Sequence, residues 1–157
     1  MPEQPETVGT PRGPWRGEVR QVLGTTFLAR AASNHWVVMD SGTAAGGSGA
    51  GASPKELVLL ALGGCTAHDV VAILRKKRAP LERLVVSVSA EEREEHPRIF
   101  TAIHLEYIFR GSGLREHDIE RAIELSETKY CSVSAMLRGV ATITTSWRIE
   151  NEPPAAG

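Results

Sequence analysis

The chain has 157 residues, with 18 basic and 19 acidic side chains and a net charge of −1 at pH 7. A chain of this length suits one domain that buries a core without metal or disulfide staples. The balanced charge gives no drive toward nucleic acid or a membrane surface, so neither is expected as a partner. No uninterrupted apolar run reaches the roughly 18 residues of a membrane span, because Gly63, His68 and Asp69 interrupt the longest one.

The two ends of the chain differ in composition from the rest. Residues 1–14 are rich in Pro, Gly and Glu and are expected to form a flexible tail, and residues 151–157 a second tail. A single domain is expected over residues 15–150. The first residues lack the apolar segment of a secretory signal, so we expect a cytoplasmic protein whose thiols are kept reduced.

The first third of the domain predicts β-structure. Three short β-like runs, 18–22, 27–31 and 35–39, are separated by turn-prone residues and indicate a hairpin or a three-stranded meander. The stretch 40–52, rich in Gly, Ala and Ser, is interpreted as a flexible loop without core-forming side chains.

Residues 53–78 predict a long apolar helix, around which the rest of the chain is organised. Ser53 is a good N-cap, Pro54 suits the first turn, and a basic run complements the helix dipole at the other end. The helix is apolar almost all round, so it is expected to be enclosed on most sides. Its length, roughly 39 Å at about 1.5 Å per residue, exceeds the width of one small domain. A second copy of the chain is expected to help cover it.

The remaining elements are two strands, a helix, a helical turn and a last strand. Runs 82–90 and 99–110 alternate apolar and polar residues and predict an antiparallel pair, with Ile99, Ile103, Leu105, Tyr107 and Phe109 inward. A helix is expected over 114–129, with a stripe of Ile119, Ala122, Ile123 and Ser126 against the sheet, followed by a helical turn at 132–137 and a strand at 140–149. The order βββ-α-ββ-α-β predicts an α+β fold in which helices cover an antiparallel sheet.

Two cysteines, Cys65 and Cys131, stand 66 positions apart. They are either inert core residues or a redox pair, in which Cys65 attacks and Cys131 resolves. Gly63 and Gly64 leave room beside Cys65 for a close backbone or a substrate. Cys131 precedes a short helix, whose dipole is expected to lower the pKa of the thiol. No CxxC motif or His/Cys cluster indicates a metal site.

His68 and Asp69 follow Cys65 by three and four positions, near the same face of the helix. His68 could act as a base for the thiol, or it could be a buried or interface histidine. Asp69 could take part in catalysis, or its carboxylate could bind backbone or histidine.

Three stretches resemble the osmotically induced and organic hydroperoxide resistance family (OsmC/Ohr), in particular its OsmC-like branch. They are SPKELVLLALGGCTAHDVVAILRKKR, EEREEHPRIFTAIHLEYIFRG and ETKYCSVSAML, within a match over 16–149. The resemblance implies a tightly intertwined homodimer, with a central helix that carries the first cysteine and two active sites at the subunit interface.

The resemblance also implies a chemistry without metal or organic cofactor. Cys65 would attack an organic hydroperoxide and become a sulfenic acid, which Cys131 would capture as a disulfide. An external dithiol would then reduce the disulfide; in the Ohr branch this donor is a lipoylated protein.

The residues that tune the thiolate depart from the family pattern. Peroxidatic members pair an acidic residue ten positions before the first cysteine with an arginine of the N-terminal hairpin, whereas Lys55 stands at that position here. Glu56 and Arg20 are the candidates for this role, with Arg16 as a further arginine nearby. This departure motivates an alternative function, a non-catalytic dimer of the same fold that senses oxidants or binds a small apolar ligand.

Overall fold

The computed structural model describes residues 15–150, so both expected tails lie outside the described residues. The chain divides into two compact units, Met1–Leu57 and Val58–Gly157. The single domain expected over 15–150 stays a prediction.

The first unit contains a three-stranded antiparallel sheet in the order β1-β2-β3. Its strands are β1 (Gly17–Leu23), β2 (Thr26–Ala31) and β3 (Trp36–Met39). Arg20 pairs with Leu28 across the first hairpin, and Leu28 pairs with Val38 across the second. The predicted meander is therefore confirmed, with strand ends shifted by one residue at most.

The loop after β3 is built around the carboxylate of Asp40, which is only 1% exposed. Its two oxygens accept six hydrogen bonds from described residues, given by the hydroxyls of Thr25, Thr26 and Ser48 and the amides of Ser41, Ser48 and Ala50. A 3-10 turn, Thr43–Ala45, lies within the loop. The sequence had predicted a loop without core-forming side chains, and the buried aspartate corrects that expectation.

The central helix α1 spans Pro54–Lys76, close to the predicted 53–78. Ser53 caps it as expected: its hydroxyl accepts the amide of Glu56, and the Glu56 carboxylate accepts the amide and hydroxyl of Ser53. This reciprocal arrangement is a capping box, which satisfies two otherwise unpaired donors.

Much of the apolar surface of α1 remains accessible in a single chain. Leu60 is 60% exposed, for example, and Val58 is 39% exposed. Among the described residues, α1 alone is long and apolar enough to cross a membrane, with a mean hydropathy of 2.0 over 18 residues. Core helices of soluble proteins reach the same values, and α1 lines the core of the second unit through Leu62, Val70 and Leu74.

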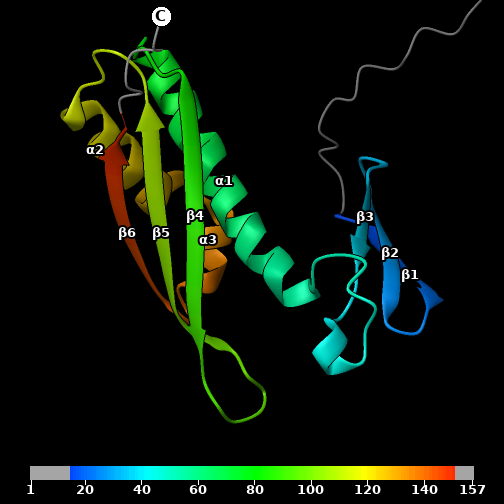
Figure 1. Cartoon of the computed structure of the whole chain (residues 1–157). Coiled ribbons are helices and arrows are strands. Elements are labelled where there is room, and N and C mark those ends of the chain that lie inside the picture. Colours follow the sequence, from blue (N-terminus) through cyan, green and yellow to red (C-terminus); the bar gives the residue numbers. More distant parts are fainter. Residues whose placement is uncertain (1–14, 151–157) are drawn as a thin grey trace, which may run out of the picture. The chain divides into compact units, whose positions relative to one another are not determined.

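The second unit has a three-stranded sheet in the order β4-β5-β6 (Figure 1). Its strands are β4 (Arg83–Glu92), β5 (Phe100–Arg110) and β6 (Thr142–Ile149). β4 and β5 are antiparallel as predicted, but β6 runs parallel to β5. The expectation of a wholly antiparallel sheet is therefore wrong at this strand. A helical crossover connects β5 to β6, and such crossovers join parallel strands.

Helices cover one face of this sheet, where α1 is joined by α2 (Glu116–Leu125) and α3 (Ser132–Leu137) (Figure 1). The predicted stripe on α2 is buried throughout, as are four of the five predicted inward residues of the β5 run. Ile99 is the exception, because it precedes β5 and is 38% exposed. An ion pair of 2.8 Å between Lys77 Nζ and Asp118 Oδ1 joins the end of α1 to the start of α2.

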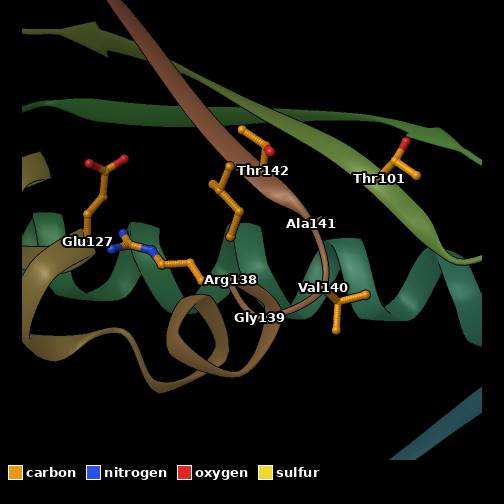
Figure 2. Close-up of a pocket in the computed structure, with 8 residues that line it drawn as sticks. Thr101, Glu127, Arg138, Gly139, Val140, Ala141 and Thr142 are labelled. Carbon is orange, nitrogen blue, oxygen red and sulfur yellow. The ribbon is translucent and has the colours of Figure 1, made fainter.

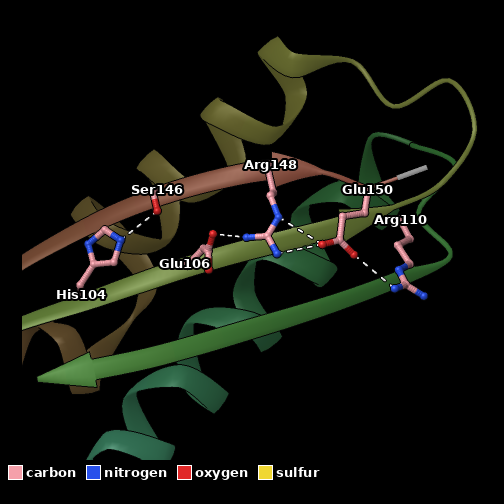
Figure 3. Close-up of polar contacts among 6 residues, drawn as sticks. All are labelled: His104, Glu106, Arg110, Ser146, Arg148 and Glu150. Atoms are coloured by element: carbon pink, nitrogen blue, oxygen red, sulfur yellow. Dashed lines mark hydrogen bonds and ion pairs between the residues drawn. The ribbon is translucent and has the colours of Figure 1, made fainter. Parts of the chain in front are cut away.

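The other face of the sheet is polar. His104 on β5 is hydrogen-bonded with Thr144 and Ser146 of β6, each at 2.8 Å. Arg148 bridges Glu106 and Glu150, and Glu150 also accepts from Arg110 (Figure 3). The chemistry that the sequence predicts therefore has to lie on the helical side, where Cys65 and Cys131 pack with the core.

Candidate functional site

The first cysteine lies on α1 where the helix approaches the sheet closely. A Cβ added to Gly63 would stand 2.8 Å from Val88 Cγ2, whereas one added to Gly64 would meet no atom within 4 Å. Gly63 therefore allows close contact between helix and strand, and Gly64 has open space at its own Cβ position. Cys65, the next residue, is half-buried.

The second cysteine is positioned by a change of helical pitch. α2 continues into a π-helical turn, Ser126–Tyr130, which ends with the amide of Cys131 donating to the carbonyl of Ser126 at 2.9 Å. Cys131 then serves as the N-cap of α3, and its Sγ accepts the amide of Ser134 at 3.3 Å. Single π-turns occur frequently at functional sites, since the extra residue redirects side chains. Here the turn directs both Ser126 and Cys131 inward, where each is buried.

Folding brings the two sulfurs together with one carboxylate. The Sγ atoms of Cys65 and Cys131 and a carboxylate oxygen of Asp69 all lie within 4.8 Å of one another. Ser126 donates a hydrogen bond of 3.1 Å to Asp69 Oδ2 and so fixes the carboxylate. The sulfurs are free thiols. A disulfide requires sulfurs about 2.05 Å apart, so a modest side-chain movement would join them.

The protonation of Cys131 differs from the prediction. The pKa of this thiol is raised to about 11, mainly by burial, with smaller contributions from Cys65 and Asp69, while the hydrogen bond from the Ser134 amide lowers it. The predicted lowering by the short helix is therefore outweighed by desolvation. Cys131 is only 3% exposed, so Cys65 is the more accessible of the two thiols.

Tyr107 of β5 completes the buried surroundings of the two thiols. Burial raises the pKa of its phenol to about 12, and the charges of Glu127, Cys131 and Asp69 act in the same direction. Its hydroxyl has no hydrogen-bond partner among the described residues. The Thr66 hydroxyl lies near enough to moderate this pKa but donates its own proton to the Gly63 carbonyl.

The other residues singled out in the sequence have different surroundings. Glu56 belongs to the capping box of α1. Arg20 binds Glu18 and lies 6.0 Å from the ring of Trp36, all within the first unit. The proposed tuning of Cys65 by Glu56 and Arg20 stays a prediction. His68 lines a groove of about 300 Å³ with Ala67, Val71, Ala72, Arg75 and Leu84, so Asp69 rather than His68 stands with the sulfurs.

A hollow in the second unit contains neither sulfur in its lining. It has a volume of about 500 Å³ and is lined by Thr101, Glu127, Arg138, Gly139, Val140, Ala141, Thr142 and Ile143 (Figure 2). Glu127 connects the two regions, since it lines the hollow and its charge acts on Tyr107. The cluster of sulfurs, rather than this hollow, has the geometry for redox chemistry.

Two members of the site could have been found from the sequence. Asp69 follows Cys65 by four positions, a rotation of about 40° around the helix, so it shares the face of the thiol. Ser126 was placed in an apolar stripe, and a polar residue at a buried position requires a polar partner. The pairing of Ser126 with Asp69 spans 57 positions and could not be read from local spacing.

Comparisons with known proteins give a consistent result. Residues 46–146 match the family model of OsmC-like proteins. Protein YhfA of Escherichia coli (strain K12) is 44% identical over 135 residues, which cover 85% of this chain and 97% of the relative. A solved structure of a hypothetical protein from Aquifex aeolicus VF5 is 30% identical, with a TM-score of 0.77, and covers 88% of this chain and 98% of its own.

A more distant solved structure shares the fold. It is an organic hydroperoxide resistance protein OsmC from Legionella pneumophila, 14% identical with a TM-score of 0.67, covering 88% of this chain and 98% of its own. The resemblance found in the sequence and the α+β fold are thus confirmed. The chain belongs to the OsmC-like protein family.

Proposed function

We propose that the protein reduces organic hydroperoxides with its two thiols. The observation that carries the proposal is the placement of Cys65 Sγ and Cys131 Sγ within 4.8 Å of one another. Membership of the OsmC-like family and the fold shared with a hydroperoxide resistance protein support it.

The proposed cycle assigns one role to each thiol. Cys65, the more accessible sulfur, attacks the distal oxygen of the hydroperoxide, which leaves an alcohol and a sulfenic acid on Cys65. Buried Cys131 then attacks the sulfenic sulfur, forming the disulfide and water. An external dithiol reduces the disulfide and restores both thiols. The cycle is proposed for a cytoplasmic protein, where such reductants are maintained.

We further propose that the working form is a homodimer. Leu60 of α1 is 60% exposed, and other large apolar side chains of the second unit are also accessible, among them Val85, Met136 and Val140. The exposed apolar side chains of α1, Val58 and Leu60, favour an interface, because large exposed apolar patches mark protein interaction sites. A second copy would cover α1 and is the proposed source of further residues near Cys65.

Peroxide turnover tests the proposed activity. Reduced protein is mixed with cumene hydroperoxide and dithiothreitol, and peroxide loss is followed for wild type, Cys65→Ser and Cys131→Ser. Wild type should consume peroxide catalytically, and Cys65→Ser should not. Wild-type turnover no faster than that of Cys65→Ser would reject the enzymatic function.

The alternative is a non-catalytic protein that binds a small apolar ligand or senses oxidants. The apolar groove of about 300 Å³ between α1 and β4, lined in part by Val71 and Leu84, favours it. If the protein senses oxidants, one equivalent of peroxide would oxidise Cys65 without sustained turnover. If it binds a small apolar ligand, a fluorescent fatty-acid analogue would bind in proportion to the amount of protein.

A further inference from the structure

The half-buried carboxylate of Asp69 lies beside the two sulfurs of the site. A carboxylate oxygen of Asp69 lies within 4.8 Å of Cys65 Sγ and Cys131 Sγ, and Oδ2 accepts a hydrogen bond of 3.1 Å from the Ser126 hydroxyl. Ser126 is itself fully buried on the turn that leads to Cys131. The carboxylate is therefore held by a hydrogen bond from Ser126 while it stands beside both sulfurs.

Disulfide formation at this site requires the removal of a proton. The Cys131 thiol attacks only after losing its proton, yet burial raises its pKa to about 11. At neutral pH such a thiol is almost entirely protonated, so solvent hydroxide would remove the proton slowly. A base inside the pocket would relieve this limitation.

Among the described titratable groups near the two thiols, Asp69 is the one that can accept the proton. Cys65 comes from α1, Tyr107 from β5 and Glu127 from the π-turn, and all three act on one another or on Cys131. Cys65 is the sulfur under attack, and burial keeps the Tyr107 phenol protonated with a pKa of about 12. Glu127 lines the neighbouring hollow. Asp69 is the group within 4.8 Å of both sulfurs.

We propose that Asp69 is the proton acceptor of the resolving step, an inference that rests on the proposed peroxidase function. As the Cys131 sulfur bonds to the Cys65 sulfur, the S–H proton of Cys131 passes to the Asp69 carboxylate. The S–O bond of the sulfenic acid breaks at the same time, and the departing hydroxide takes that proton to leave as water. In the reductive half, the protons of the external dithiol end on Cys65 and Cys131.

The direction in which Asp69→Asn changes the rate of disulfide formation separates proton acceptance from a purely electrostatic effect. The negative charge of Asp69 raises the pKa of Cys131, so its removal alone would make the thiol more acidic and the disulfide faster to form. Loss of a proton acceptor has the opposite effect. Asp69→Asn should therefore slow disulfide formation, by about 10²-fold at pH 7, the lower range for general base catalysis.

The experiment follows the two steps separately. Reduced protein receives one equivalent of cumene hydroperoxide and is quenched over time with dimedone, which traps sulfenic acid, or with N-ethylmaleimide, which traps thiols. Intact mass then reports sulfenic acid and disulfide. Asp69→Asn should form sulfenic acid on Cys65 at the wild-type rate and accumulate it. Its disulfide formation should rise about tenfold per pH unit from pH 7 to 9, because solvent hydroxide takes over.

Three further variants act as controls. Ser126→Ala keeps the carboxylate but removes its hydrogen bond, and should give an intermediate slowing. Asp69→Glu should restore part of the rate. Asp118→Asn removes a different aspartate, which is buried and pairs with Lys77, and should lower stability without changing the rate or the pH profile.

The outcomes separate the two proposals. Disulfide formation in Asp69→Asn that is as fast as in wild type, or faster, overturns the role of Asp69 and leaves the peroxidase function standing. Wild type that forms neither sulfenic acid nor disulfide overturns both proposals. Slowing in Asp69→Asn with an unchanged pH profile also contradicts proton acceptance, because it indicates a role in positioning alone.

Discussion

Gly63 of α1 lies against Val88 of β4 so closely that an added Cβ would stand 2.8 Å from Val88 Cγ2. Gly64, the next residue, has open space in the same position. Two neighbouring glycines in one helix therefore have different reasons to be there, and the pair provides a matched test.

Gly64→Ala should stabilise the protein and Gly63→Ala should not. Alanine favours a helix over glycine by roughly 1 kcal/mol, and both variants gain this contribution. In Gly63→Ala the new methyl group meets Val88, whose β-branched side chain is stiff, so the overpacking offsets the gain by about 1–3 kcal/mol. Urea unfolding of both variants measures the difference. Equal stabilities would contradict the close contact between α1 and β4.

Asp40→Asn should loosen the loop that follows β3. Hydrogen bonds from Ser48 and Thr25 hold the pKa of this carboxyl well below its ordinary range. The stabilisation of the folded state by the Asp40 carboxylate is therefore complete above about pH 4, the ordinary pKa of an aspartate. It is lost as the pH falls through the depressed pKa of the folded state. An amide cannot accept all of these donors, so elastase, which cleaves after small residues, should cut residues 41–52 faster.

Thr25→Val serves as the graded control for this loop. It removes one donor, whose hydroxyl lies 2.7 Å from Asp40 Oδ1, and leaves the carboxylate in place. Its cleavage rate should fall between those of wild type and Asp40→Asn. A cleavage rate of Asp40→Asn equal to wild type would show that the carboxylate does not order the loop.

Tyr107→Phe should leave stability unchanged or raise it by about 1 kcal/mol. The hydroxyl is buried and has no partner among the described residues, and leaving such a group unpaired costs about 1–3 kcal/mol. The ring packs with Phe109 and is retained in the variant. Tyr130→Phe, at an exposed tyrosine, is the neutral control. Destabilisation by more than about 1 kcal/mol would indicate a strong hydrogen bond to this hydroxyl.

The alkylation of Cys131 should show an apparent pKa well above that of an ordinary thiol. Burial is the main cause of the raised value of about 11, so the shift should persist in the Cys65→Ser variant, where Cys131 is the single thiol. Iodoacetamide rates from pH 7 to 11, monitored by mass, give the midpoint. An ordinary midpoint near 8.5 would contradict the burial of this residue.

The same shift makes stability depend on alkaline pH. The folded state favours the protonated Cys131 thiol. The contribution of this thiol to folding stability is therefore fully present below the ordinary thiol pKa and is lost as the pH rises toward 11. Cys131→Ala should therefore lose less stability than wild type over this range. The phenol of Tyr107 contributes to both proteins and cancels in the comparison.

Local patterns in the sequence predicted most of the elements but not how they pair. Capping at Ser53, alternation along β5 and the apolar stripe of α2 act over a few residues, and each is confirmed. The parallel pairing of β6 depends on the whole crossover that precedes it. Strand direction is therefore a property of the connection, which local periodicity does not contain.

The functional site was predicted only in part, because local sequence patterns do not contain long-range packing. The two cysteines were identified by their surroundings and by resemblance, but their protonation depends on burial, which is decided by packing. The helix at Cys131 is present, yet desolvation outweighs its influence on the pKa. Asp69 and Ser126 meet only in the folded chain, so the carboxylate of the site could be weighed but not assigned from the sequence.

The most direct test of the account is the product of a single oxidation. Reduced wild-type protein is treated with one equivalent of cumene hydroperoxide, digested without reductant and analysed by mass spectrometry. We predict one disulfide that joins the Cys65 and Cys131 peptides, with both thiols lost together. Over-oxidised Cys65 with Cys131 still a free thiol, or both thiols unchanged, would contradict it.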